Sequence, residues 1–431
     1  MKLTSRQVIV TFFVEVGQST RTIESNGLFA RQFVSGHHFY YLQNGRLIHN
    51  TMKKILFLLL MSCATLMSCQ PDEEEQIDES TQQVSRTIMV FMPFTGNLYD
   101  DLNTNINYMA AAITNNGGSN GTQLLVFIAQ DRQTAHLIRL RYENGICHRD
   151  TLRTYTSPEY LTLKGRAQLF TEMKALAPAD EYGLIVGCHG KGWLPGEDSN
   201  NTLKWIGADI NGYRIDISDF AQSMSDAGLH AQFIAFDDCY MSTIEVAYDL
   251  RHVTDHIIAS TSEIMASGMP YHRIYTRLIQ PTIDYGAICN DFVDYYKSSR
   301  TPYGTIGVTC CQYIDEMAAI MKKINTTHTI SSEQLQMVQD LDGATFTPTV
   351  FFDFGSYVRH LAGSDATLLA AYEQLLTVLV PYKAHTGAIF SGYYQRATKI
   401  TEFSGIAISD PSNHSLTNDS KTHTAWWKAT H

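Results

Sequence analysis

The chain has 431 residues, of which 44% are hydrophobic and 17% charged, as in a globular protein of one large domain or two medium-sized ones. A net charge of -11 provides no basic surface for nucleic acid, so a nucleic-acid partner is not expected. The eight cysteines form no CxxC pair and no regular spacing, which indicates neither a metal site nor a disulfide framework.

The N-terminal region contains a segment typical of an export signal. Met52-Lys53-Lys54 is a short basic start, and residues 55–67 are almost wholly apolar. This run is shorter than the roughly 20 residues that span a bilayer, so it predicts a signal peptide over residues 52–68. An internal buried helix is the alternative. Because a signal peptide stands near the true start, residues 1–51 are expected to be a non-native upstream extension.

The end of this signal, Leu66-Met67-Ser68-Cys69, resembles the lipobox of bacterial lipoproteins, in which the cysteine is acylated. Residues 69–85 are polar and acidic, and they are expected to form a solvated linker similar to the tethers of Bacteroides-type lipoproteins. The resemblance implies a protein of the bacterial cell envelope. It would be held in the outer membrane by a lipid on Cys69 and could face the cell exterior.

The remaining chain, residues 86–431, alternates apolar runs with amphipathic segments. The apolar runs predict strands at 86–94, 123–129, 182–187, 231–236 and 256–260, with a hairpin over 135–155. Helices are predicted at 98–114, 163–177, 216–227 and 241–251. This alternation indicates an α/β fold, with a largely parallel sheet flanked by helices on both faces.

The last third of the chain is predicted to be a mixed α/β part. Its predicted helices are 286–298, 314–326, 351–362 and 366–382, and its predicted strands are 305–309, 387–392 and 404–408.

Two residues with catalytic potential directly follow predicted strands. His189 follows the strand at 182–187 and Cys239 the strand at 231–236, and ligands bind at the carboxyl ends of such strands. If the strands are neighbours, a nucleophilic thiol and a proton-exchanging imidazole face each other. Cys239 is also predicted to open the helix at 241–251, whose N–H groups would favour a thiolate and receive an oxyanion. Gly190 could supply a second N–H. Taken singly, residues such as His189 and Cys239 are structural more often than catalytic.

The segments that contain these residues resemble a known family. Residues 184–193 read LIVGCHGKGW and residues 233–248 read FIAFDDCYMSTIEVAY, similar to the His-Gly and Asp-x-Cys blocks of clostripain-like peptidases. These peptidases belong to the clan of caspases and gingipains. The resemblance covers roughly residues 86–428 and implies a caspase-like fold. It also implies an endopeptidase that cleaves peptide or protein substrates through an acyl-enzyme, with His189 and Cys239 as its dyad.

The same resemblance assigns further roles. Asp237 would line the pocket for an arginine or lysine at the cleavage site, with Glu263 as a secondary pocket residue. An aspartate at this position is equally suited to cap the helix predicted after it. Some members of the family cut themselves between the two blocks, which places a self-cleavage site near Lys204. No cofactor is expected. A dependence on calcium is implied only by the resemblance, because it occurs in some members of the family.

Two departures from the family pattern leave an alternative open. Asp238 precedes the cysteine where a small residue is common, and its carboxylate would raise the pKa of the thiol. Lys191 stands where a glycine is common. The alternative is a catalytically silent surface lipoprotein of the same fold, which binds peptide or glycan without cleaving it.

Overall fold

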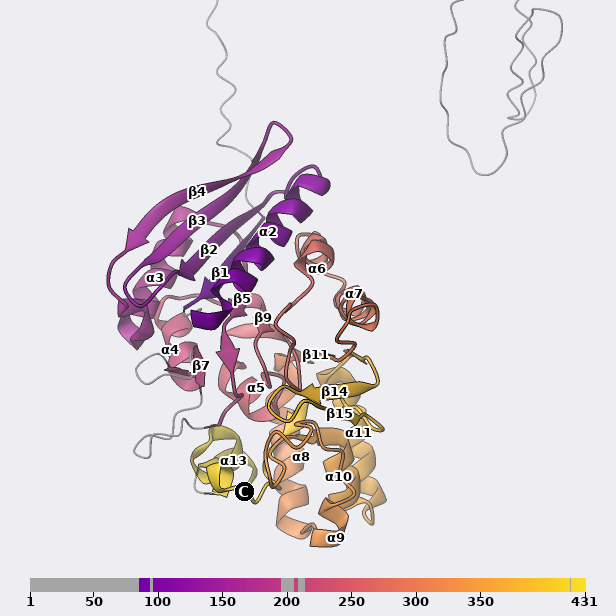
Figure 1. Cartoon of the computed structure of the whole chain (residues 1–431). Helices are drawn as coiled ribbons and strands as arrows, with labels where there is room; N and C mark the ends of the chain where they lie inside the picture. The colour runs from indigo at the N-terminus through magenta and orange to yellow at the C-terminus, as the bar shows by residue number, and fades with distance from the viewer. Residues whose placement is uncertain (1–84, 94–95, 195–204, 208–213, 419) are drawn as a thin grey trace, which may run out of the picture. The chain divides into compact units, whose positions relative to one another are not determined.

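A nine-stranded sheet is the centre of the computed structural model, which describes residues 85–93, 96–194, 205–207, 214–418 and 420–431 (Figure 1). In sheet order the strands are β13 (Tyr382–His385), β11 (Thr305–Cys310), β10 (Thr254–Ala259), β9 (Ala231–Asp237), β5 (Glu181–Gly187), β1 (Arg86–Met92), β2 (Thr122–Ala129), β3 (Ala135–Glu143) and β4 (Ile146–Tyr155). The predicted upstream extension, signal peptide, lipidation site Cys69 and cleavage site Lys204 lie outside the described residues.

The middle of the sheet is parallel and its margins are antiparallel. β2, β1, β5, β9 and β10 pair in parallel, whereas β3 with β4 on one side and β11 with β13 on the other run antiparallel. Parallel strands with both faces covered read as continuous apolar runs, which is why these segments were recognisable in the sequence. The predicted largely parallel sheet is confirmed.

Helices cover both faces of the sheet. α2 (Tyr99–Asn115), α6 (Tyr271–Leu278) and α7 (Tyr285–Lys297) pack on one face, and α3 (Leu163–Leu176), α4 (Ile217–Asp226), α5 (Ile244–Leu250) and α8 (Ile314–Thr327) on the other (Figure 1). Successive residues of β1 divide between the two cores: Ile88 and Val90 face α2, whereas Met89 and Phe91 face α3. The sheet is therefore buried on both sides.

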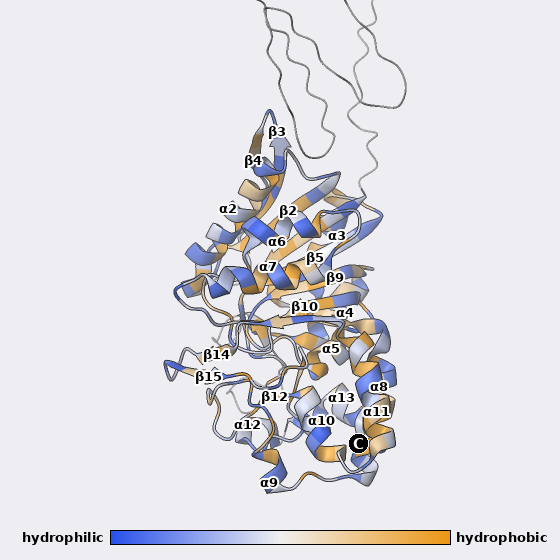
Figure 2. Cartoon of the chain, turned by 90° about the vertical axis from the view of Figure 1, so that its right-hand side faces the viewer, coloured by the Kyte–Doolittle hydropathy of each residue, from blue (hydrophilic) through white to orange (hydrophobic). Residues whose placement is uncertain are grey.

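The C-terminal part extends the core on the α3 side. It contains α9 (Ser332–Leu335), α10 (Phe354–Ala362), α11 (Ala366–Leu379), α12 (Ser415–Asn418) and α13 (Ala425–Thr430). This part also contains two short antiparallel ladders. One pairs β12 (Phe352–Asp353) with β16 (Ala407–Ile408), and the other pairs β14 (Ala388–Ser391) with β15 (Arg396–Lys399). Figure 2 shows the β14–β15 hairpin projecting from the side of this part. A separate ladder links β6 (His189–Gly190), β7 (Trp205–Gly207) and β8 (Arg214–Asp216).

The helix predicted at 241–251 is wrong at its start. α5 begins at Ile244, because the Thr243 side chain accepts a hydrogen bond from the backbone N–H of Val246 and caps the helix there. Between β9 and α5, Tyr240 adopts a positive φ of 60° and the chain turns sharply. Cys239 therefore lies before the capped start of α5 and does not open that helix.

Two further helices differ from the prediction. The helix predicted at 351–362 starts at Phe354, where Asp353 caps it by accepting from the Ser356 N–H at 2.8 Å. The eight-residue helix α6 was not predicted, although its buried residues Tyr271, Ile274, Tyr275 and Leu278 follow the spacing of an amphipathic helix.

Candidate active site

The register of the sheet brings His189 and Cys239 together. β5 and β9 are parallel neighbours whose last partners are Gly187 and Asp237, and the two candidate residues each follow two positions later. Neighbouring strands are about 4.8 Å apart, so both residues emerge side by side at the carboxyl edge. Gly190 lies against the nucleophile segment, because a Cβ there would be 2.8 Å from the Cys239 carbonyl oxygen. The two strand ends are therefore in direct contact.

A third strand end contributes a residue that sequence reasoning missed. β1 lies on the other side of β5, and Asn97 follows it in the 3-10 turn η2 (Gly96–Leu98). The Asn97 Oδ1 atom lies 2.9 Å from His189 Nε2. Since an amide oxygen can only accept, this contact is a hydrogen bond in the tautomer that carries its proton on Nε2. The available signal was that Asn97 also follows an apolar strand.

The Cys239 thiol is partly exposed and lies against the loop that follows β10. The backbone N–H of Ile264 donates to Sγ at 3.4 Å, and Sγ lies 3.9 Å from the Ile264 carbonyl oxygen. Burial raises the pKa of the Cys239 thiol to about 12, and the nearby carboxylate of Glu263 adds to this effect. The resting thiol is therefore protonated at neutral pH, and its attack on a substrate requires a base.

Asp238 faces away from the thiol toward the end of β5. Its fully buried carboxylate accepts from the backbone N–H of Cys188, and the Cys188 thiol donates to it at 3.6 Å. Burial raises the pKa of Asp238 well above its usual range. Its charge raises the pKa of Cys239 as expected, but less than burial and Glu263 do. Cys188 precedes His189 and Asp238 precedes Cys239. This contact therefore holds the two candidate residues close together.

Asp237 ends β9, and its carboxylate points toward α2 and α6. It is 5% exposed and accepts from the Met269 N–H at 2.8 Å and from Asn105 Nδ2 at 3.1 Å. Burial raises the pKa of Asp237 to about 6, and no cation of the described residues lowers it. The helix-capping alternative is wrong, because Thr243 caps α5.

The loop after β10 passes directly over the Asp237 carboxylate. Gly268 has a φ of 62°, and a Cβ there would lie 2.6 and 2.7 Å from the two carboxylate oxygens. A larger residue would both strain the backbone and fill the space over Asp237.

Glu263 is joined to the C-terminal part of the chain. Its Oε1 accepts from the Thr345 hydroxyl at 2.8 Å and from the Tyr240 hydroxyl at 3.3 Å, and its Oε2 accepts from the Gly392 N–H at 2.7 Å. The carboxylate therefore links the nucleophile segment to the β14–β15 hairpin.

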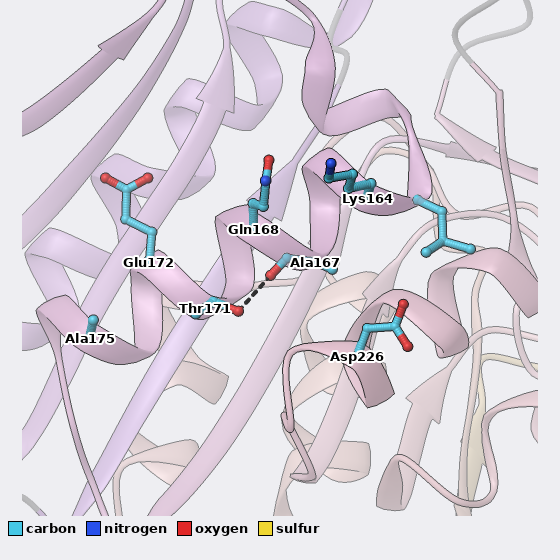
Figure 3. Close-up of a pocket in the computed structure, with 8 residues that line it drawn as sticks. Lys164, Ala167, Gln168, Thr171, Glu172, Ala175 and Asp226 are labelled. Atoms are coloured by element: carbon cyan, nitrogen blue, oxygen red, sulfur yellow. Dashed lines mark hydrogen bonds between the residues drawn. The ribbon is translucent and has the colours of Figure 1, made fainter.

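A shallow groove elsewhere on the molecule contains none of the candidate residues. It runs along α3 beside the end of α4, between Lys164, Glu172 and Asp226 (Figure 3). The hydrogen bond drawn in it, from the Thr171 hydroxyl to the Ala167 carbonyl at 2.8 Å, lies within α3 itself. The lining of this groove contains no cysteine and no histidine, so the strand ends remain the candidate active site.

Comparison with known proteins agrees with this geometry. The model of the clostripain family, Peptidase_C11, matches residues 90–373. The chain belongs to the clostripain family. It is similar to a secreted C11 cysteine protease from Bacteroides thetaiotaomicron, "iotapain", with 39% identity and a TM-score of 0.76. That match covers 81% of this chain and 100% of the other. The predicted family, its caspase-like fold and the assignment as a cysteine peptidase are confirmed.

Two further structures resemble this clostripain-family chain. A clostripain from Bacteroides thetaiotaomicron, in complex with the peptide inhibitor BTN-VLTK-AOMK, is 46% identical with a TM-score of 0.50, covering 53% of this chain and 99% of the other. An inactive zymogen C11 protease from Parabacteroides distasonis is 28% identical with a TM-score of 0.69. That match covers 80% of this chain and 98% of the other. No curated protein sequence matches the chain significantly.

Proposed function

We propose that this clostripain-family peptidase cleaves peptide bonds with His189 and Cys239 as its catalytic dyad. The observation that carries the proposal is their position at adjacent ends of the paired strands β5 and β9. Asn97, bonded to Nε2 of His189, supports the role of Nδ1 as the base.

The proposed reaction passes through a thioester. Cys239 Sγ attacks the carbonyl carbon of the substrate while its proton passes to Nδ1 of His189. The C–N bond then breaks, and His189 returns the proton to the leaving amine. A water molecule attacks the thioester and gives one proton to His189, which passes it to the departing thiolate. The free acid and the original thiol result.

The negative oxygen of the tetrahedral intermediates needs N–H donors. We assign this role to the backbone N–H groups of Cys239 and Gly190, the two predicted oxyanion residues. The close approach of Gly190 to the Cys239 backbone supports this assignment, because it keeps the two backbone segments side by side.

We assign Asp237 to the recognition of an arginine or lysine at the cleavage site. A buried carboxylate without a cation among the described residues can stabilise a guanidinium or ammonium that enters from the substrate. The related clostripain was crystallised with an inhibitor whose peptide ends in lysine, which also supports this preference. Glu263 uses both oxygens for contacts inside the protein, so its proposed contribution is to shape the pocket wall.

We also propose that the chain cleaves itself near Lys204. A related C11 protease is described as an inactive zymogen, which supports an activation step. A chain that is fully active while it runs unprocessed on a denaturing gel would contradict this proposal.

The predicted lipid on Cys69 is a further proposal. One relative is described as secreted, and no helix in the described part of this chain is long and apolar enough to cross a membrane. A lipidated chain should enter the detergent phase on Triton X-114 partitioning, and Cys69→Ser should return it to the aqueous phase. Equal partitioning of both chains would refute the anchor.

Hydrolysis of fluorogenic peptides tests the proposed function. The chain, with and without calcium and prior proteolysis, should cleave peptides that end in Arg or Lys, and Cys239→Ala should be inactive. His189→Ala should lose at least about a hundred-fold in kcat, the usual contribution of a general acid–base. Cleavage after Asp or Leu instead would refute the basic pocket. No cleavage after any residue would favour the silent peptide-binding alternative.

A further inference from the structure

The tip of the β14–β15 hairpin presents two aromatic side chains to solvent. Tyr393 is 80% exposed and Tyr394 is 52% exposed, and their ring centroids are 4.8 Å apart at an interplanar angle of 81°. Adjacent exposed aromatic rings form an apolar patch of the kind that contacts ligands, since tyrosine offers a large surface at low entropic cost.

The hairpin tip is held firmly. The Gly392 N–H donates to Glu263 Oε2 at 2.7 Å, and the Tyr394 N–H donates to the Ser391 hydroxyl at 3.3 Å. Within β14, one position before Ser391, Phe390 stacks on Tyr303 with ring centroids 5.1 Å apart. The two tyrosines are therefore presented by an anchored hairpin, and a ligand that binds them has little loop entropy to overcome.

The same anchor leads directly to the nucleophile. Glu263 is followed by Ile264, whose N–H donates to Cys239 Sγ at 3.4 Å. The Glu263 carboxylate also accepts from the hydroxyl of Tyr240, the residue after the nucleophile. A single loop thus joins the thiol on one side to the hairpin tip on the other.

The sheet order gives the direction of a bound substrate. β9, which Cys239 follows, lies between β5, which His189 follows, and β10, which leads into the Glu263 loop. In the proposed reaction His189 protonates the leaving amine, so the departing part of the substrate lies on the β5 side. The acyl part, with the residues that precede the cleaved bond, therefore lies on the β10 side, where the hairpin is anchored.

We infer that Tyr393 and Tyr394 form a subsite for an apolar or aromatic side chain that precedes the arginine or lysine at the cleavage site. This inference rests on the proposed dyad for the direction of the substrate. The rings would cover that side chain against the Glu263 loop, and the exposure of both tyrosines would fall on binding.

Peptide binding tests the subsite without turnover. Fluorescein-labelled peptides with Leu and Phe before a lysine, or with glycines there, are titrated by anisotropy into the full chain carrying Cys239→Ala. Adding Tyr393→Ala and Tyr394→Ala should weaken the Leu-Phe peptide by about ten-fold, as expected for loss of one apolar burial, and change the glycine peptide little. Tyr108→Ala, an exposed tyrosine on α2, is the matched control and should change neither affinity.

The possible results separate this inference from the proposed function. An equal loss of affinity for both peptides, or no loss of affinity for either, would overturn the subsite. An affinity that depends only on residues placed after the lysine would also overturn it. Hydrolysis by the chain that retains Cys239 is measured in parallel. If the tyrosines govern binding of the Leu-Phe peptide but no peptide is cleaved, the proposed catalytic dyad falls, and the tyrosines remain a peptide-binding patch without an assigned place relative to a cleaved bond.

Discussion

At the scale of the single residue, Asp237 is the group whose electrostatics say most about the substrate. Its carboxylate is buried, accepts two hydrogen bonds from neutral groups and has a pKa raised to about 6. Loss of hydration disfavours its charged form, and a cation that entered the site would reverse that effect. In the free protein, Asp237 should therefore change charge near pH 6.

This leads to a pH dependence of substrate binding. Because the pKa of Asp237 is raised, the carboxylate is ionised above about pH 6 and neutral below it. In the Cys239→Ala chain, the Kd of a lysine peptide should be constant above that pH and rise by about ten-fold for each unit below it. A peptide with norleucine in place of lysine is the uncharged control, and Asp237→Asn should remove the dependence. The same profile for both peptides would exclude Asp237 as the partner of the cation.

The predictable part of the site depended on local signals. His189 and Cys239 could be predicted because each follows an unbroken apolar run, and a parallel sheet gathers such ends at one edge. The start of α5 was missed although Thr243, which caps it, is a local signal, whereas the packing of the turn at Tyr240 against Phe351, with ring centroids 4.6 Å apart, joins residues far apart in the chain. The role inferred for Tyr393 likewise could not be predicted from the sequence, because it depends on the contact between its hairpin and Glu263.

At the scale of the elements, the site consists of three consecutive strand ends. β9 provides Cys239, β5 provides His189 and β1 leads to Asn97, in the order in which the strands lie in the sheet. Since the parallel ladders fix the register of all three, the orientation of the imidazole follows from the fold rather than from a flexible loop.

Removal of the Asn97 side chain should affect proton transfer more than substrate binding. In Asn97→Ala, Nε2 of His189 loses its acceptor, so both tautomers become populated and kcat should fall by about ten-fold with KM little changed. The pH profile of kcat should shift, which a purely structural role would not cause. Asn97→Asp, which keeps an acceptor, should recover part of the rate. A rise in KM alone would instead indicate that Asn97 contacts the substrate.

At the scale of the whole molecule, the C-terminal part supports the segment that contains Cys239. The Ser242 hydroxyl donates to the Gly405 carbonyl at 2.9 Å, and the Ala407 N–H donates to the Ser242 carbonyl at 2.9 Å. The Ser409 N–H donates to the buried Glu245 in the first turn of α5. The segment that carries Cys239 is thus held between the sheet and residues about 160 positions later. The two parts are therefore joined by hydrogen bonds on both sides of Thr243.

Selective trapping of the nucleophile tests the central claim most directly. The chain is treated at pH 7.5 with a lysyl-peptide acyloxymethyl ketone, and the modified residue is mapped by mass spectrometry. We predict a single adduct on Cys239, lost in His189→Ala, while Cys147 and Cys310 stay free although they are also partly exposed. An adduct spread over these cysteines, or none on Cys239 after calcium and proteolytic activation, would contradict the assignment of the dyad.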